Sequence, residues 1–280
     1  MANIEPEGQF AQVNGVNVHF HDIGTGPVLI MLHGSGPGAT GWSNYHRNIP
    51  DLARNRRVIC PDLPGFGKSD VKPVDAPMPG YWAEIIAGLM DHLGIDTADF
   101  VGNSMGGMIS LKLALEAPER VGRMVLMGPG GSTPVTSQWP SEGIKQIIGF
   151  YEGDGPSMAR MRAFASQFVY DPAELTDDLL EARLKAATDP RIVAQPPMRI
   201  GAAGMPEELW RDKRLTGLMH ETLIIWGRED RVLPLDMAFS LIRQLPRARL
   251  FVMPQCGHWV QWEHAAEFNQ LVSNFLAGPA

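Results

Sequence analysis

Short apolar runs typical of β-strands alternate along this chain with segments of helical spacing, and this alternation limits the possible folds more than any other feature. Residues 28–32 form a continuous apolar run, as in a strand buried on both faces. Residues 81–93 carry apolar side chains at helical spacing. Strands that alternate with helices predict an α/β fold with a mostly parallel sheet, covered by helices on both faces. We expect strands at residues 9–13, 16–23, 28–32, 58–61, 98–102, 123–127, 223–227 and 250–253, the first two joined by a hairpin at Asn14-Gly15.

The alternation stops between about residues 132 and 215. Helical spacing occurs there at residues 143–151, 158–168 and 176–187, separated by Pro, Gly and Asp. We therefore divide the chain into a core domain of residues 1–131 and 216–280 and a helical insertion of residues 132–215. Ligands of open α/β folds bind at the carboxyl edge of the sheet, so we interpret the insertion as a lid over that edge. A structural elaboration of the core is the alternative.

Composition and charge exclude several classes of protein. The chain carries 24 Lys and Arg against 31 Asp and Glu, a net charge of −7, whereas nucleic-acid binders normally show a basic excess. Its apolar runs are too short to cross a bilayer, and residues 1–8 contain no apolar signal-peptide segment. Two cysteines, Cys60 and Cys256, are too few for a disulfide framework. We expect a cytoplasmic protein with no nucleic-acid or membrane partner.

The sequence contains no pattern typical of a metal or cofactor site. No group of His, Cys, Asp and Glu shows metal-ligand spacing. The first parallel strand is not followed by a dinucleotide-binding fingerprint, and the glycine-rich loop at residues 33–38 lacks the Lys-Ser/Thr ending of a phosphate-binding loop. We therefore expect neither a metal nor a cofactor.

The most specific local motif is Gly102-Asn103-Ser104-Met105-Gly106, which matches G-x-S-x-G and lies between a strand and a helix. In this motif the serine occupies a sharp, strained turn, so the residues two before and two after it must be tiny. The turn makes the hydroxyl project clear of the backbone. The motif predicts that Ser104 is a nucleophile; a glycine-rich turn with an ordinary helix-capping serine is the alternative.

A serine hydroxyl is a poor nucleophile until a base removes its proton. In folds with this motif the partners follow in the order serine, acid, histidine. Of the eight histidines, His258 lies in the loop after the last strand, at the edge of the sheet where Ser104 is expected. His264, at the start of the last helix, is the only near rival. We predict that His258 is the base.

The acid is expected after the preceding strand, which ends at Gly227. Asp230 follows at a reachable loop position, and Glu229 is the competitor. Asp236 is expected to cap the next helix. We predict that Asp230 orients the imidazole of His258 and stabilises its protonated form.

An oxyanion hole requires two backbone N–H groups. The residue after the nucleophile, Met105, supplies one at a helix N-terminus. The loop at residues 33–38 supplies the other, with Ser35 the first candidate and Gly36 the second. His33 is expected to hold this loop and not to act as a second base.

At this point the sequence resembles the α/β-hydrolase superfamily over nearly its whole length. Several motifs look like the meta-cleavage product hydrolases, serine-dependent enzymes that hydrolyse carbon–carbon bonds in bacterial aromatic degradation. The segments that carry the resemblance are His33-Gly34-Ser35-Gly36-Pro37-Gly38-Ala39, Gly41-Trp42-Ser43-Asn44, Gly102-Asn103-Ser104-Met105-Gly106-Gly107, Met127-Gly128-Pro129-Gly130-Gly131, Trp226-Gly227-Arg228-Glu229-Asp230-Arg231, Cys256-Gly257-His258-Trp259 and Gln261-Trp262-Glu263-His264.

The resemblance implies a 2-hydroxy-6-oxohexa-2,4-dienoate substrate with an alkyl or aryl group on C6. Water splits the C5–C6 bond into a carboxylic acid, such as benzoate, and 2-hydroxypenta-2,4-dienoate. The dienol first becomes its keto tautomer. Ser104, activated by His258, then attacks the C6 ketone, and water hydrolyses the acyl-enzyme.

The resemblance also implies which residues bind this substrate. Such enzymes hold the carboxylate and the C2 oxygen with an arginine from the lid and asparagines near the nucleophile; by position these are Arg183, Asn44 and Asn103, with Trp259 beside them. A guanidinium suits a planar carboxylate. The alternative for Arg183 is a surface residue paired with Glu181 or Asp178. The apolar C6 side would be lined by Phe168, Trp210, Val232 and Leu233, unless these belong to the core.

Two other functions remain open. A carboxylesterase or lactonase could use the same triad, although Arg183, Asn44 and Asn103 would then have no task on a neutral ester. A hydrolase-fold receptor could bind a small ligand under the lid without turnover. Within the resemblance, the apolar lid favours an aryl group on C6, and the sequence looks most like the hydrolases of biphenyl and dibenzofuran or dioxin breakdown. The resemblance also implies a homodimer or larger homo-oligomer.

Overall fold

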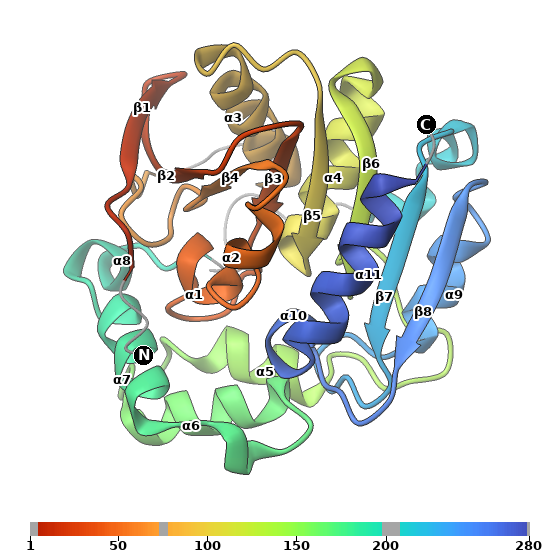
Figure 1. The fold of residues 1–280 in the computed structure, drawn as a ribbon. Coiled ribbons are helices and arrows are strands. Elements are labelled where there is room, and N and C mark those ends of the chain that lie inside the picture. Colours follow the sequence, from red (N-terminus) through yellow and green to blue (C-terminus); the bar gives the residue numbers. More distant parts are fainter. Residues whose placement is uncertain (1–4, 73–77, 198–207, 279–280) are drawn as a thin grey trace.

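A computed structural model describes residues 5–72, 78–197 and 208–278, and its centre is an eight-stranded sheet (Figure 1). The strand order is β1-β2-β4-β3-β5-β6-β7-β8. β2 pairs antiparallel with β1 and β4, and all other neighbours are parallel, which confirms the predicted α/β fold. The strands are β1 (Gln9–Val13), β2 (Val16–Ile23), β3 (Val28–Leu32), β4 (Arg57–Pro61), β5 (Ala98–Asn103), β6 (Val121–Met127), β7 (Thr222–Gly227) and β8 (Ala248–Met253).

Each face of the sheet is buried under its own set of helices. Because side chains alternate along a strand, Ile30 and Leu32 of β3 belong to one apolar core, and Leu29 and Met31 belong to the other. The first core includes α3 (Met78–His92), α4 (Met105–Glu116) and α9 (Asp236–Ile242); the second includes α1 (Gly41–Tyr45), α2 (Ile49–Leu52), α10 (Val260–Glu263) and α11 (Ala265–Ala277). Burial on both faces explains why the parallel strands are continuous apolar runs.

Between β6 and β7 the chain is helical, and the described residues of 132–215 contain no strand. The helices are α5 (Glu142–Gly149), α6 (Met158–Phe168), α7 (Asp177–Ala187) and α8 (Pro190–Ala194). Figure 1 shows this insertion at the end of the sheet toward which β5, β7 and β8 point. Residues 198–207 of the predicted lid, and residues 1–4 of the N-terminal segment for which we expect no signal peptide, lie outside the described residues.

The expectation that Asp236 caps a helix is wrong. Leu235 occupies the N-cap position of α9, and Asp236 is the first helical residue. Its Oδ2 instead accepts the N–H groups of Val135, Thr136 and Ser137, at 2.5–3.0 Å. Asp236 therefore fastens the start of the insertion to the core.

The sequence also gives no expectation for the short helices α1, α2, α8 and α10, since four or five residues show little periodicity. Among the described residues, no helix combines the length and the hydropathy needed to span a bilayer.

Candidate active site

Ser104 lies in a strained turn between β5 and α4. Its φ of 53° and ψ of −111° are unusual for a residue with a side chain. The turn is held by the Ser104 N–H, which donates to Met127 O at 2.8 Å. A β-carbon on Gly106 would lie 2.0 Å from Leu32 O, so only glycine fits there. Ser104 occupies the N-cap position of α4, but its side chain makes no capping hydrogen bond, so the alternative role of a capping serine is not observed.

Asp230 and His258 form a buried pair at the same edge of the sheet. His258 Nδ1 lies 2.6 Å from Asp230 Oδ2, and both side chains are 1% exposed. Asp230 Oδ1 accepts the N–H groups of Val232 and Leu233 at 2.7 and 2.9 Å. With Nδ1–H donated to the carboxylate, the lone pair of the imidazole is on Nε2. That atom is buried and has no hydrogen-bond partner among the described residues.

The two rival residues have other partners. Glu229 Oε2 accepts the Cys256 N–H at 3.1 Å, and its Oε1 contacts Arg228 at 2.7 Å. His264 Nε2 lies 3.0 Å from Gln255 O. Both residues therefore support the His258 loop and take no part in the buried pair.

The strand order brings Ser104 and this pair to one edge. β5, β6, β7 and β8 are neighbours, and Ser104, Asp230 and His258 follow β5, β7 and β8. Asn103 Nδ2 donates to Met127 O and to His258 O, both at 3.4 Å. A serine hydroxyl, an imidazole with an unpartnered nitrogen and a carboxylate paired with that imidazole therefore lie at one edge of the sheet, and acyl transfer to a serine requires these three groups.

The loop predicted to complete the oxyanion hole runs next to Ser104. A β-carbon on Gly34 would lie 3.3 Å from Ser104 Cβ. His33 Nδ1 donates to Gly34 O at 2.8 Å, and its Nε2 accepts the Leu63 N–H at 2.9 Å, which confirms the structural role predicted for His33. Burial lowers its pKa and so favours the neutral ring, which also suits the Nε2 that accepts an N–H group. Met105 is the first residue of α4, where N–H groups have no partner within the helix.

Arg183 on α7 is a buried cation beside this loop. Its side chain donates from Nη2 to Pro37 O at 2.9 Å, and its guanidinium lies 4.7 Å from the ring centre of Trp259. Among the described residues no carboxylate forms an ion pair with it, so the alternative pairing with Glu181 or Asp178 is not found. Burial lowers the pKa of Arg183 to about 10. A buried charge without a counter-ion is costly, which points to a site for an anion.

A family model described as the alpha/beta hydrolase fold matches residues 27–265. A 2-hydroxy-6-oxo-6-phenylhexa-2,4-dienoate hydrolase from Burkholderia cepacia is 44% identical over 269 residues, which cover 95% of this chain and 93% of the relative. The chain belongs to the α/β-hydrolase family, among its meta-cleavage product hydrolases.

Other relatives of this hydrolase differ in the substrate they are named for. A 2-hydroxy-6-oxononadienedioate/2-hydroxy-6-oxononatrienedioate hydrolase from Comamonas testosteroni is 41% identical over 95% of this chain and 93% of its own. A solved structure of a 2-hydroxy-6-oxo-6-phenylhexa-2,4-dienoate hydrolase from Rhodococcus sp. strain RHA1 superposes with a TM-score of 0.84 at 32% identity, covering 98% of this chain and 99% of that one.

The other predicted binding residues are buried or half-buried. Asn44 on α1 is buried, and its Nδ2 has no hydrogen-bond partner among the described residues. The ring of Phe168 lies edge-on to His258, with 5.2 Å between ring centres. Trp210 is half-buried under the Arg211 guanidinium. Val232 and Leu233 are buried, and their N–H groups hold Asp230, a role that sequence patterns do not reveal.

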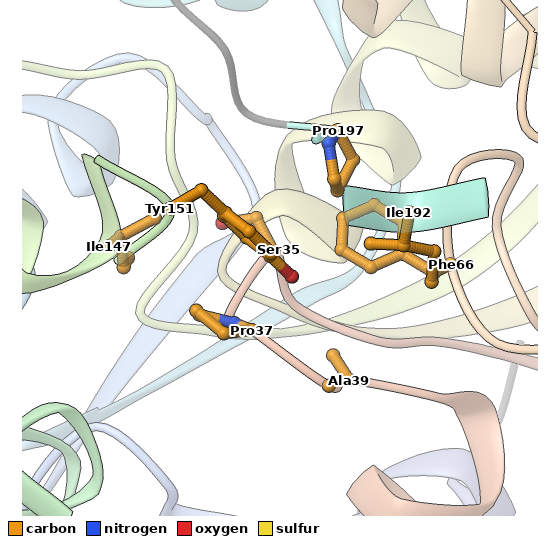
Figure 2. Close-up of a pocket in the computed structure, with 9 residues that line it drawn as sticks. Ser35, Pro37, Ala39, Phe66, Ile147, Tyr151, Ile192 and Pro197 are labelled. Atoms are coloured by element: carbon orange, nitrogen blue, oxygen red, sulfur yellow. The ribbon is translucent and has the colours of Figure 1, made fainter. Parts of the chain in front are cut away.

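A small pocket beside the loop at residues 33–38, called here the oxyanion loop, is lined mainly by residues that the sequence does not single out (Figure 2). Ser35 is the only predicted site residue in its lining; Phe168, Trp210, Val232 and Leu233 are not part of it. Tyr151, also in the lining, lies near Arg183. No pattern marks such positions, because insertion helices expose different residues to a pocket according to how they pack. The lining is Ser35, Pro37, Gly38, Ala39, Phe66, Ile147, Tyr151, Ile192 and Pro197.

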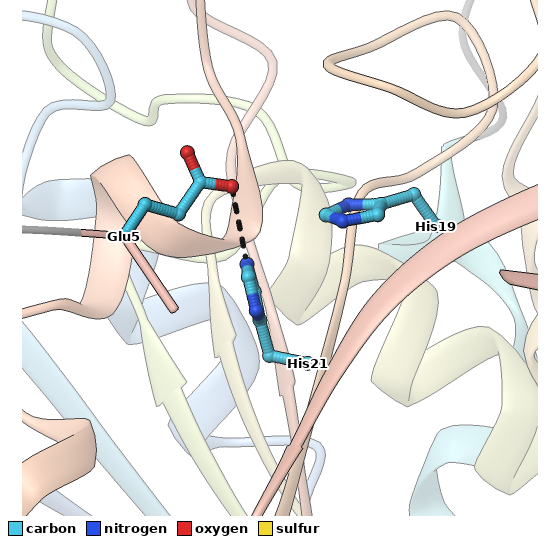
Figure 3. A group of neighbouring side chains, drawn as sticks. All are labelled: Glu5, His19 and His21. Carbon is cyan, nitrogen blue, oxygen red and sulfur yellow. Dashed lines mark ion pairs between the residues drawn. The ribbon is translucent and has the colours of Figure 1, made fainter. Parts of the chain in front are cut away.

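One group of side chains has the composition of a metal site. Glu5, His19 and His21 bring possible ligand atoms within 4.8 Å of one another (Figure 3). Sequence spacing does not reveal this group, because Glu5 is far in sequence from His19 and His21, which lie on one face of β2. Glu5 Oε1 is 3.4 Å from His21 Nε2 and 2.8 Å from Lys68 Nζ. The Lys68 ammonium therefore already neutralises the carboxylate, and we assign the group no metal.

Proposed function

We propose that this hydrolase cleaves the C5–C6 bond of 2-hydroxy-6-oxo-6-aryl- or 6-alkylhexa-2,4-dienoates, giving a carboxylic acid and 2-hydroxypenta-2,4-dienoate. The observation that carries the proposal is the buried Arg183, which has no carboxylate partner among the described residues. The substrate carboxylate supplies the missing counter-ion. A planar carboxylate can take two parallel hydrogen bonds from the guanidinium fork.

The contacts of these groups support the following catalytic roles. His258 first moves a proton from the C2 oxygen to C5, which gives the keto tautomer. Ser104 Oγ then attacks C6 while His258 Nε2 takes its proton, and the resulting oxyanion accepts N–H groups from Met105 and from Ser35 or Gly36. The C5–C6 bond breaks, C5 receives the proton, and water hydrolyses the acyl-enzyme. Asp230 stabilises the imidazolium that forms in each half of the reaction.

The dienoate end lies between Arg183, Asn44, Asn103 and Trp259, and the insertion acts as a lid over this end. The unpartnered Asn44 amide supports this placement, since buried polar groups normally have partners and the substrate C2 oxygen would provide one. Trp259 stacks beneath Arg183 and fixes the direction of its fork.

The C6 group is aryl or alkyl. Phe168, Trp210, Val232 and Leu233 would line its side of the site, and none of them carries a charge for the second carboxylate of a nonadienedioate. We therefore place the substrate nearer the 6-phenyl compound of the Burkholderia cepacia relative, in biphenyl or dibenzofuran breakdown. We also propose that the protein is cytoplasmic and forms a homodimer or larger homo-oligomer. Size-exclusion chromatography with light scattering tests the oligomeric state.

A carboxylesterase or lactonase would use the same three catalytic groups but leave Arg183 without a task. A spectrophotometric panel of yellow aryl and alkyl dienoates, compared with nitrophenyl esters of the same acyl groups, separates these functions. We expect dienoates to be preferred in kcat/KM, with 6-phenyl ahead of 6-methyl. Ester turnover without dienoate turnover would overturn the proposal.

A further inference from the structure

The loop that carries His258 is held by an acidic side chain that the proposed mechanism does not use. Glu263 ends the short helix α10, shortly after His258. Its Oε1 accepts the Gly257 N–H at 2.8 Å, and its Oε2 accepts the N–H of Tyr170 in the insertion. One carboxylate therefore joins the histidine loop to the segment that follows α6.

Backbone contacts at the same place make the position of the imidazole depend on this junction. Phe168 O accepts the N–H groups of His258 and Trp259, at 2.8 and 3.1 Å. A β-carbon on Gly257 would lie 2.7 Å from Phe168 O and 2.9 Å from Val169 Cα, so the two backbones are in direct contact. The edge-on ring of Phe168 adds a side-chain contact to His258. A shift of residues 168–170 would therefore move the imidazole.

We propose that Glu263 is a positioning residue, whose carboxylate holds the imidazole of His258 in place for proton transfer by fastening the His258 loop to residues 168–170. The inference rests on the proposed role of His258 as the base. Both oxygens of a carboxylate accept hydrogen bonds, whereas an amide has a donor in place of one acceptor, and a protonated carboxyl has a hydroxyl that donates one hydrogen bond. The amide leaves the N–H of Gly257 or Tyr170 facing another donor, and protonation leaves one of these N–H groups with a weaker, neutral acceptor.

The surroundings of Glu263 make this fastening sensitive to pH. Burial raises the pKa of Glu263 to about 7, against the two N–H groups that favour its carboxylate. The titratable groups that face it are the Cys256 thiol, 3.7 Å from Oε1, and the neighbouring His264; Arg231 contacts the other side of the junction, where its Nη2 donates to Tyr170 O. The carboxylate is present above about pH 7 and is lost below it. Acidification therefore removes activity through a proton that is not on the catalytic triad.

The test compares Glu263→Gln with Glu267→Gln, an exposed glutamate on α11 that serves as the matched control. We expect Glu263→Gln to lower kcat roughly ten- to hundredfold on both a nitrophenyl ester and the 6-phenyl dienoate, with KM changed less than about twofold. The acid side of the wild-type kcat/KM profile should fall with a slope approaching two, and the Gln variant should fall with a slope of one. The control should match the wild type.

Wild-type kcat and an unchanged acid slope in a folded Glu263→Gln protein would overturn the proposal. If the variant does not fold, hydrogen exchange on the wild type decides: protection of the Gly257 and Tyr170 amides, corrected for intrinsic exchange, should rise from pH 6 to pH 8. Equal protection at both values would also overturn it. A loss on the ester with no turnover of any dienoate by the wild type would refute the substrate and retain the role of Glu263.

Discussion

Replacing Arg183 with methionine should reduce activity on dienoates without reducing stability. Arg183 is 4% exposed, and its guanidinium contacts the Pro37 carbonyl and the rings of Trp259 and Phe164. Methionine has a similar length and no charge. If the guanidinium serves to bind the substrate, its removal should lower activity and leave the stability of the fold unchanged or higher.

The magnitudes follow from the surroundings of the side chain. Burial shifts the pKa of Arg183 from 12.5 to about 10, which corresponds to about 3 kcal/mol of disfavoured charge. The hydrogen bond to Pro37 O and the contact with Trp259 together return about 2 kcal/mol. We therefore expect Arg183→Met to gain roughly 1 kcal/mol, or a Tm higher by roughly 2–4 °C. Loss of the charged contact should lower kcat/KM on the 6-phenyl dienoate roughly ten- to hundredfold.

Thermal melts and two activity assays measure these effects, with the exposed Arg162→Met on α6 as the control. Hydrolysis of a nitrophenyl ester should change less than about twofold, since the ester has no carboxylate for the guanidinium to hold. A lower Tm together with equal losses on both substrates would show that Arg183 only fastens the oxyanion loop, and the argument from its missing counter-ion would fail.

Two further predictions concern carboxylates with defined partners. Asp230→Asn should lower kcat roughly ten-thousandfold in the steady-state assay. The amide oxygen would keep the N–H groups of Val232 and Leu233, so the amide NH2 would point toward His258 Nδ1 and force the wrong tautomer of the imidazole. A loss below tenfold would contradict the role of Asp230. Hydrogen bonds from Thr136 and Ser137 lower the pKa of Asp236 to about 2, although burial alone would raise it. The contribution of the Asp236 carboxylate to stability is therefore present above pH 4 and disappears toward pH 2. The Tm of Asp236→Asn should therefore be below that of the wild type at pH 7 and equal to it near pH 2; an equal Tm at pH 7 would refute the fastening role.

The meeting of Ser104, Asp230 and His258 at one edge is predictable from the sequence because a parallel sheet brings the ends of its strands together. Ser104, Asp230 and His258 follow three separate strands, and pairing those strands in parallel brings the three loops together whatever the details of packing. The glycines around Ser104 mark the strained turn, since the structure leaves no room for a β-carbon at Gly106. These features depend on local sequence and on strand order, both of which leave strong patterns.

The insertion is harder to predict because its packing depends on contacts distant in sequence. The spacing of residues 158–168 predicts α6 to the residue, yet it does not indicate that Phe168 O holds two N–H groups of the His258 loop. The pocket lining and the burial of Arg183 likewise depend on how α5, α7 and α8 lie on the oxyanion loop. Asp236 resembles a helix cap in sequence, but its partners are at Val135–Ser137, across the start of the insertion.

The central claim is that Ser104 and His258 act together in a two-stage cleavage, and stopped-flow absorbance of the 6-phenyl dienoate tests it most directly. Ser104→Ala should remain folded, bind the dienoate, shift its absorption spectrum and stop before product, with kcat lowered at least roughly a thousandfold. His258→Ala should lose both the spectral shift and the cleavage, since the first proton transfer needs its imidazole. Near-normal turnover by Ser104→Ala, or a spectral shift in His258→Ala as fast as in Ser104→Ala, would contradict the account.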